Sequence, residues 1–278
     1  MITDSQTNKL FLADCLPEKQ PEFFKRFSKV LSNCNIDIEF LEKTKDIWAV
    51  DYMPIQISKS KFVQFTYNPD YLQTKIRRKT ISDVNSICKA INLTPAISDI
   101  ILDGGNVVRA DDKVIMCDKV FYENQNIPEK DLIKQLKGLL KVDKLFFVPW
   151  DPDDFTGHAD GMVRFINNNT VLINDYSEDP EFQTSFRMSI HNAGLDWIEL
   201  PYNPPDDPTS TSAEGLYLNY LQMEQGVIIP TFNNKRVDEK ARKVLEEVFK
   251  GQTIATIDCN ELAEEGGVLN CITWNIYL

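Results

Sequence analysis

Five polar residues recur along this chain at nearly constant intervals, and each one begins a segment that the sequence predicts to be a β-hairpin. The intervals are 55, 54, 59 and 52 residues, and the positions are Asp51, Asn106, Asp160, Asn219 and Cys271. A period of this length is typical of blades or stacked units rather than of separate domains. We therefore expect residues 1–278 to form a single domain built from one repeated unit.

The repeated unit consists of a hairpin, an amphipathic helix and a short strand. Hairpins are predicted at residues 54–67, 106–117, 162–174 and 217–232, and a fifth begins at residue 271. Apolar residues at three- and four-residue intervals predict helices at 81–91, 129–140, 180–193 and 238–249. Strands are predicted after them at 95–98, 144–148, 197–200 and 253–257. An N-terminal helix at 21–31 and a strand at 37–41 complete the unit that the C-terminal hairpin begins.

This sharing of one unit between the two chain ends favours a closed ring over an open solenoid. We therefore predict an α/β fold, a pseudo-fivefold propeller of five blades, in which all five hairpin starts face one central cavity. An ordinary α/β sheet is the alternative, but it gives no reason for the equal spacing.

The charge balance makes some partners improbable. The chain has 42 acidic and 30 basic residues, a formal net charge of −12. Such a surface repels nucleic acid and anionic membranes and attracts a cationic small molecule. The sequence has no apolar run of eighteen residues, no signal-peptide pattern, and six scattered cysteines without paired spacing. These features predict reduced thiols and a cytoplasmic location, and leave a homo-oligomer open.

His158 is the best candidate for a general acid or base. It is one of two histidines and lies beside Gly157 and Gly161, just before a predicted hairpin. On an extended chain Asp160 would project to the same side, and a neighbouring carboxylate raises the pKa of an imidazole. The other histidine, His191, lies within a predicted helix and is expected to be structural.

The remaining periodic residues suggest how a ligand could be held and attacked. Asp51 and Asp160 could together grip a planar guanidinium group, and Trp48 could form a wall beside it. Cys271 follows Gly266-Gly267 and could act as a thiolate nucleophile near an imidazole. Two alternatives stay open: a metal-dependent hydrolase using the acidic run from Asp151 to Asp160, and a propeller that binds a cation without turnover.

Several motifs, in this order, resemble the agmatine deiminase and Porphyromonas-type peptidylarginine deiminase family of the guanidine-modifying superfamily. The resemblance spans roughly residues 46–278 and is carried by Trp48-x-x-Asp51-x-x-Pro54, Gly104-Gly105-Asn106, Gly157-His158-x-Asp160, Tyr217-x-Asn219 and Gly266-Gly267 through Asn270-Cys271-Ile272-Thr273. It implies the five-bladed pentein propeller and an enzyme that needs neither cofactor nor metal.

The resemblance also implies roles for the site residues. Cys271 would attack the guanidinium carbon while Asp51 and Asp160 hold its nitrogens, and His158 would protonate the departing ammonia and then activate water. Agmatine is the expected substrate, with arginine or a peptidyl arginine side chain as the rival. The other substrate-binding candidates are Trp48, Asn219, Asp103, Asn106, Arg77 and Arg78.

Some positions depart from the usual family pattern. Val50 and Met53 stand where agmatine deiminases usually have Arg and Gly, and Asp103 stands where they usually have Glu. These departures leave the expected catalytic residues unchanged. They affect the prediction of which residues contact the end of the substrate opposite the guanidinium group. A substrate carboxylate needs a cationic partner, which Arg77 and Arg78 could supply; agmatine needs none.

Overall fold

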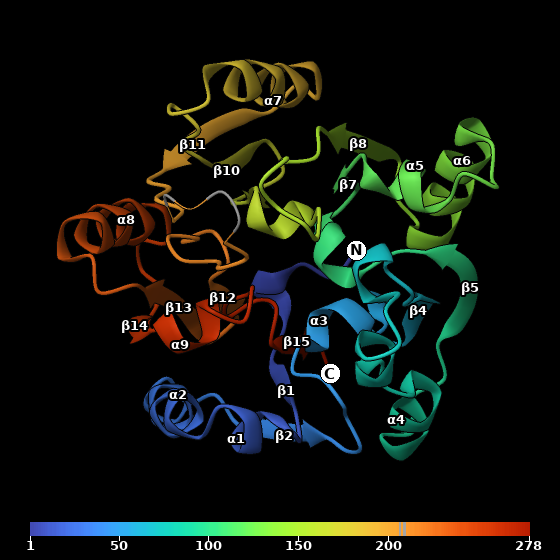
Figure 1. Cartoon of the computed structure of the whole chain (residues 1–278), viewed down its shortest axis with the longest axis horizontal. Helices are drawn as coiled ribbons and strands as arrows, with labels where there is room; N and C mark the ends of the chain where they lie inside the picture. The colour runs from blue at the N-terminus through green and yellow to red at the C-terminus, as the bar shows by residue number, and fades with distance from the viewer. Residues whose placement is uncertain (206, 208–209) are drawn as a thin grey trace.

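Five small sheets surround a central axis in the computed structural model, which describes residues 1–205, 207 and 210–278 (Figure 1). In each sheet the first two strands are antiparallel, and the third is parallel to the middle one. The predicted five-bladed α/β propeller is therefore confirmed.

Four sheets follow one another along the chain. They are formed by β3 (Ile55–Ser58), β4 (Lys61–Thr66) and β5 (Ala96–Ile101); by β6 (Val108–Arg109), β7 (Lys113–Cys117) and β8 (Lys144–Val148); by β9 (Val163–Phe165), β10 (Thr170–Asn174) and β11 (Asp196–Leu200); and by β12 (Leu221–Met223), β13 (Gly226–Thr231) and β14 (Ile254–Asp258). Between the second and third strands run α4 (Val84–Ala90), α5 (Lys119–Glu123) with α6 (Glu129–Leu140), α7 (Pro180–Asn192) and α8 (Lys235–Val248).

The fifth sheet joins the two ends of the chain and closes the ring. Its strands are β15 (Thr273–Ile276), β1 (Lys9–Ala13) and β2 (Ile38–Leu41), with α1 (Leu16–Lys19) and α2 (Pro21–Asn33) between β1 and β2. The hairpin that begins at Cys271 thus takes its second strand from the N-terminus, since Lys9 pairs with Ile276. The shared blade was predicted from the sequence, but β1 was not predicted as a strand.

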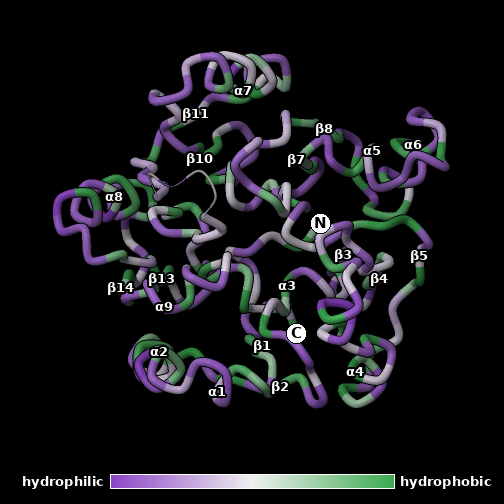
Figure 2. Tube along the Cα trace, in the orientation of Figure 1, coloured by the Kyte–Doolittle hydropathy of each residue, from purple (hydrophilic) through white to green (hydrophobic). Residues whose placement is uncertain are grey.

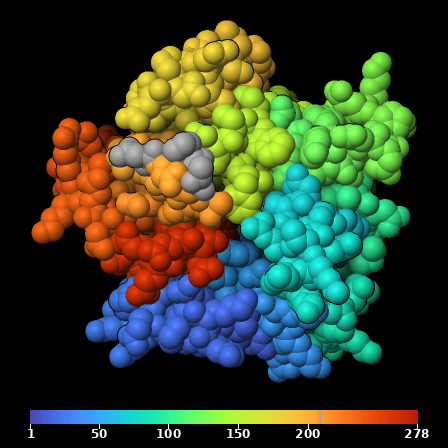
Figure 3. Space-filling model, viewed as in Figure 1, coloured from blue at the N-terminus to red at the C-terminus, as the bar shows by residue number. Residues whose placement is uncertain are grey.

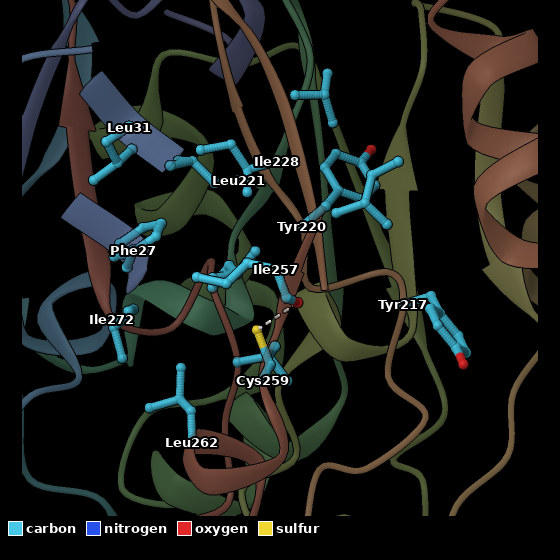
Figure 4. Packing of buried hydrophobic residues seen from close by; sticks show 14 of the residues in the cluster. Phe27, Leu31, Tyr217, Tyr220, Leu221, Ile228, Ile257, Cys259, Leu262 and Ile272 are labelled. Atoms are coloured by element: carbon cyan, nitrogen blue, oxygen red, sulfur yellow. Dashed lines mark hydrogen bonds between the residues drawn. The ribbon is translucent and has the colours of Figure 1, made fainter. Parts of the chain in front are cut away.

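Apolar helix faces pack on the sheets and form the hydrophobic cores. The peripheral helices alternate hydrophilic and hydrophobic residues along their turns (Figure 2). Figure 4 shows one core, in which Phe27 and Leu31 of α2 lie beside Leu221, Ile228 and Ile257 of the neighbouring blade. The core therefore binds the N-terminal helix to a blade formed more than 180 residues later in the chain.

Two helices begin at residues other than those predicted, because a capping side chain sets the start. Asp83 accepts a hydrogen bond from the Ser86 amide, so α4 starts at Val84 rather than at residue 81. Asn234 accepts one from the Val237 amide, so α8 starts at Lys235 rather than at residue 238. At 14 residues α8 is the longest helix in the described ranges, and none of these helices has the length and apolar character for crossing a bilayer.

We expect Trp274→Ala to destabilise the ring at its closure. The side chain is buried, its ring lies 5.2 Å from that of Phe11 and 6.2 Å from that of Phe62, and its indole N–H donates to the Pro54 carbonyl. Removing a buried Trp side chain costs about 3–5 kcal/mol of unfolding free energy. Denaturant unfolding of the variant measures this loss.

Ile97→Ala is the control for that variant, because Ile97 is 62% exposed on an outer strand. Its loss should stay below about 1 kcal/mol. Equal losses in the two variants would contradict the role of Trp274 in holding adjacent blades together.

Candidate active site

A cavity opens at the centre of the face shown in Figure 3, where four chain segments meet. Its volume is about 830 Å³ including its open mouth. The mouth is formed by Tyr71 and by residues 153–156, 210–214 and 265–267. Six of the residues singled out in the sequence line the cavity: Trp48, Asp51, His158, Asp160, Asn219 and Cys271. The repeat thus brings together residues spread over more than 220 positions of the chain.

Short turns before the first strand of each blade deliver these residues. Asp51 lies on α3 (Ala49–Tyr52), and Asp160 lies on the 3-10 turn η5 (Ala159–Gly161). Asn219 precedes β12, and Cys271 precedes β15. Each of these turns lies near the central axis of the ring. Side chains from neighbouring blades can therefore meet there.

Asn106 occupies the equivalent turn, η4 (Gly104–Asn106), but does not line the cavity. Its side-chain oxygen accepts the Cys117 amide at 2.6 Å and the Ala159 amide at 3.3 Å, and its nitrogen donates to the Cys117 carbonyl. These bonds fasten η4 to its own blade and to the next one. The prediction of Asn106 as a substrate-binding residue is therefore not supported by its position.

Two amides orient Asp160. One carboxylate oxygen of Asp160 accepts hydrogen bonds from the side-chain nitrogens of Asn219, at 3.2 Å, and Asn270, at 2.6 Å. The oxygen of Asn219 accepts the backbone N–H of Cys271 at 3.2 Å. Asn219 therefore ties the carboxylate and the thiol-bearing residue to each other. Asn270 belongs to a motif noted in the sequence, yet nothing local indicated that its side chain would turn towards Asp160.

His158 lies between two carboxylates. Its Nδ1 is 3.5 Å from Asp51 and its Nε2 is 3.0 Å from Asp103. Burial lowers the pKa of this imidazole, but the charge of Asp51 and the bond to Asp103 outweigh that effect and raise the pKa to about 10. His158 is therefore an imidazolium at neutral pH, positioned to donate a proton.

Asp160 was expected to lie beside His158 and raise the pKa of the imidazole; its charge does contribute to the raised pKa, but among the described residues Asp160 makes no hydrogen bond to the ring. The segment Ala159–Gly161 forms a 3-10 turn, so residues two apart do not share a face as they do on a strand. Asp160 turns to the two asparagines, and the hydrogen-bonding carboxylate of His158 is Asp103 from another blade.

Asp103 lies behind His158, outside the cavity lining, and is 3% exposed. The same oxygen that contacts His158 accepts a hydrogen bond of 2.6 Å from the hydroxyl of Tyr71. Asp103 is therefore placed to hold the imidazole rather than to bind substrate, which corrects the expectation. Tyr71, which the sequence analysis missed, links this pair to the cavity mouth.

Cys271 lies in the cavity as a protonated thiol. Burial raises the pKa of its thiol well above the usual value, and the carboxylates of Asp160 and Asp51 raise it further. A cation placed beside these carboxylates would oppose both effects. The site can therefore form a thiolate when a positive charge enters.

Two glycines allow this close packing. A Cβ on Gly105 would lie 2.7 Å from both Asp51 Oδ1 and His158 Nδ1, and the Gly105 amide donates to Asp51. A Cβ on Gly267 would lie 2.5 Å from the Trp48 ring, which the sequence analysis expected to form a wall. Any larger residue at either position would displace a side chain of the site.

Arg77 and Arg78 are not brought to the cavity. Both are exposed on the 3-10 turn η3 (Arg77–Thr80), and Arg77 donates to the Tyr71 carbonyl. The described lining has no Lys or Arg, whereas its mouth carries Asp153, Asp154, Glu214 and Glu265. The expectation that these arginines would meet a substrate carboxylate is therefore not supported.

The acidic run from Asp151 to Asp160 folds as turns instead of gathering its carboxylates. Asp151 accepts the Asp153 amide, and Asp154 accepts the amides of Thr156 and His158. Within the described ranges, no three His, Cys, Asp or Glu side chains are grouped to hold a metal ion. The arrangement gives the metal-dependent alternative no ligand set in this part of the chain.

We expect Asp103→Asn to lower the pKa of His158 strongly, because burial would then oppose the imidazolium with one carboxylate fewer. The two histidine signals of the chain can be followed by proton NMR against pH, with His191→Asn to assign them. In the wild type His158 should stay protonated up to about pH 10.

Glu199→Gln, which alters a carboxylate paired with Arg187 far from the site, is the control and should leave the titration unchanged. A His158 signal that titrates at the ordinary pKa of about 6.5 in both wild type and Asp103→Asn would contradict this account.

The chain is similar in sequence to known proteins. The profile of the Porphyromonas-type peptidyl-arginine deiminase family matches residues 6–276. The agmatine deiminase of Pseudomonas aeruginosa (strain UCBPP-PA14) is 24% identical over 63% of this chain, and that of Medicago truncatula is 24% identical over 73%. These alignments span 56% and 63% of the relatives' own lengths.

Solved structures share the fold over nearly the whole chain. The agmatine deiminase of C. jejuni superposes with a TM-score of 0.82 at 19% identity, covering 100% of this chain and 95% of the other. That of Enterococcus faecalis gives 0.79 at 18% identity, covering 99% and 94%. The match over residues 6–276 shows that this chain belongs to the Porphyromonas-type peptidyl-arginine deiminase family.

Proposed function

We propose that this protein is a cysteine-dependent amidine hydrolase that converts agmatine to N-carbamoylputrescine and ammonia. The observation that carries the proposal is the grouping of Cys271 with the buried side chains of His158, Asp51 and Asp160 in one cavity. These side chains supply a soft nucleophile, a proton donor and two anions. That set suits the cleavage of a C–N bond in a delocalised cation.

Substrate binding would activate the nucleophile. A guanidinium held between Asp51 and Asp160 places its positive charge beside Cys271, and this charge opposes the two carboxylates that raise the pKa of the thiol. The thiol then releases its proton to solvent water, and the resulting thiolate attacks the guanidinium carbon. Activation is thereby coupled to the arrival of the cation.

The protonated His158 fits the next step. It donates its proton to the leaving nitrogen as the C–N bond breaks, releasing ammonia and leaving an amidino group on the Cys271 sulfur. The neutral imidazole then removes a proton from water, which attacks the same carbon. Expulsion of the sulfur yields the ureido product, and Asp103 holds the ring through both steps.

The cavity mouth favours agmatine over arginine. Agmatine carries a second cation at the far end, whereas free arginine and a C-terminal arginine carry a carboxylate. The described mouth offers acidic side chains, among them Glu214 and Glu265, and no Lys or Arg to pair with a carboxylate. Trp48, Tyr71 and Phe155 can flank the aliphatic stem.

The decisive experiment measures ureido-product formation from agmatine, free arginine and a C-terminal-arginine peptide. We expect kcat/KM for agmatine to exceed that for the other two by at least about tenfold, because one unfavourable charge contact at the mouth costs about that factor. Cys271→Ala should lose all turnover, and a chelator should leave the wild type unaffected.

Cys34→Ala, which removes a buried thiol outside the cavity, is the matched control and should retain activity. A faster reaction with arginine or the peptide would overturn the choice of agmatine. Activity in Cys271→Ala would overturn the thiol mechanism, and binding of all three without turnover would identify a cation-binding propeller instead.

A further inference from the structure

A second, smaller cavity adjoins the active site. It shares Asp160 with the substrate cavity, and the two otherwise have different lining residues in the described part of the chain. Its lining includes Asn270 together with Asp4, Arg109 and Arg164. Three charged side chains therefore lie behind the carboxylate that faces the substrate, and the mechanism above uses none of them.

Arg164 makes the most specific contacts in this cluster. It lies on β9, is 3% exposed, and donates to Asp4 Oδ2 at 2.6 Å. Its other terminal nitrogen donates to the carbonyl of Tyr220 at 3.2 Å and contacts that of Leu218 at 3.5 Å. The guanidinium also lies 4.5 Å from the centre of the Tyr220 ring.

The two carbonyls that Arg164 contacts flank Asn219. The Asn219 side chain in turn donates to Asp160 and accepts the backbone N–H of Cys271. The contacts of Arg164 hold the backbone on both sides of Asn219, and this backbone sets the position of the Asn219 side-chain amide. Hydrogen bonds, joined through the backbone around Asn219, therefore link Asp4 in the N-terminal turn η1 (Asp4–Gln6) to the Asp160 carboxylate and to the backbone N–H of Cys271.

We propose that Arg164 is a positioning residue for the reaction: anchored by Asp4, it fixes the backbone around Asn219 and thereby orients Asp160 and Cys271. The inference rests on the proposed function for what the site binds. Arg164 does not line the substrate cavity, so it acts from behind the site, chiefly through Asn219. The N-terminal segment, which does not line the substrate cavity, thus contributes to the geometry of the site.

The positive charge of Arg164 also acts on Asp160. Burial raises the pKa of Asp160, and His158, Asn270 and Arg164 oppose that shift. Arg164 therefore also favours the ionised form of the carboxylate that must hold a cationic ligand.

Arg109 offers a matched control. It donates to the other oxygen of Asp4 at 2.8 Å and lines the same small cavity. Of the two described arginines on Asp4, only Arg164 also bonds the chain around Asn219. A role limited to anchoring the N-terminus predicts similar effects for both arginines, whereas positioning through Asn219 predicts an effect for Arg164 alone.

The experiment measures agmatine binding by calorimetry in the full-length Cys271→Ala protein, in which no turnover is expected. Adding Arg164→Met should weaken binding about tenfold, the effect of losing a hydrogen bond to a charged group, and adding Arg109→Met should change it less than about twofold. In an Asn219→Ala background, Arg164→Met should cause clearly less than its tenfold effect, because the path through Asn219 is already broken and only the direct charge effect of Arg164 on Asp160 remains.

Equal weakening by the two arginine variants, or full additivity of Arg164→Met with Asn219→Ala, would overturn the inference. If circular dichroism shows that Arg164→Met does not fold, Asp4→Asn serves instead and should weaken binding about threefold. An unchanged dissociation constant in that variant would also overturn the inference. Absence of agmatine binding by Cys271→Ala itself would instead reject the proposed function, and the inference with it.

Discussion

The site depends on acidic groups buried at the axis of the ring, where burial raises the pKa of Asp51 to about 8 and also raises that of Asp160, so that both carboxylates need a cation nearby. Asp51, Asp103 and Asp160 are each less than 8% exposed and surround the single imidazolium of His158. Burying carboxylates is costly unless donors and opposite charges compensate. The amide of Gly105 and the side chains of Asn219 and Asn270 supply part of that compensation. A cation entering the cavity would supply the rest, which is a physical reason for such a site to select one.

This charge cluster in turn needs a closed ring. The three carboxylates, the imidazole and the thiol come from turns of four different blades, so no single blade contains the site. Closure is achieved when β1 from the N-terminus pairs with β15, which directly follows the turn carrying Cys271. The two chain ends therefore hold the nucleophile in place, both through this pairing and through the contact of Asp4 with Arg164.

Much of the fivefold arrangement could be predicted because the repeat appears directly as a regular spacing of residues in the sequence. Equal spacing of Asp51, Asp160, Asn219 and Cys271 was enough to predict that they meet, and the structure places all four in one cavity. The orientation of a side chain on a short turn is not encoded in spacing. Asn106 occupies the equivalent turn yet points into the blades, and no periodicity argument distinguishes it.

Long-range polar contacts were equally out of reach from the sequence. Asp103 was noted, but its bond to a histidine 55 positions later depends on how two blades are juxtaposed. Arg164 was not singled out, although it is a charged residue between Val163 and Phe165 in a predicted hairpin. Its partner Asp4 lies 160 positions away and gave no signal at all.

A bound cation should convert Cys271 from thiol to thiolate. The ultraviolet absorbance of a thiolate, followed in a stopped-flow mixing experiment with agmatine, tests this most directly, with Cys271→Ala as the blank. Because the pKa of the free thiol is raised well above its usual value, we expect no thiolate signal at neutral pH before mixing and a transient one on binding. A full thiolate signal already present without ligand would contradict the account.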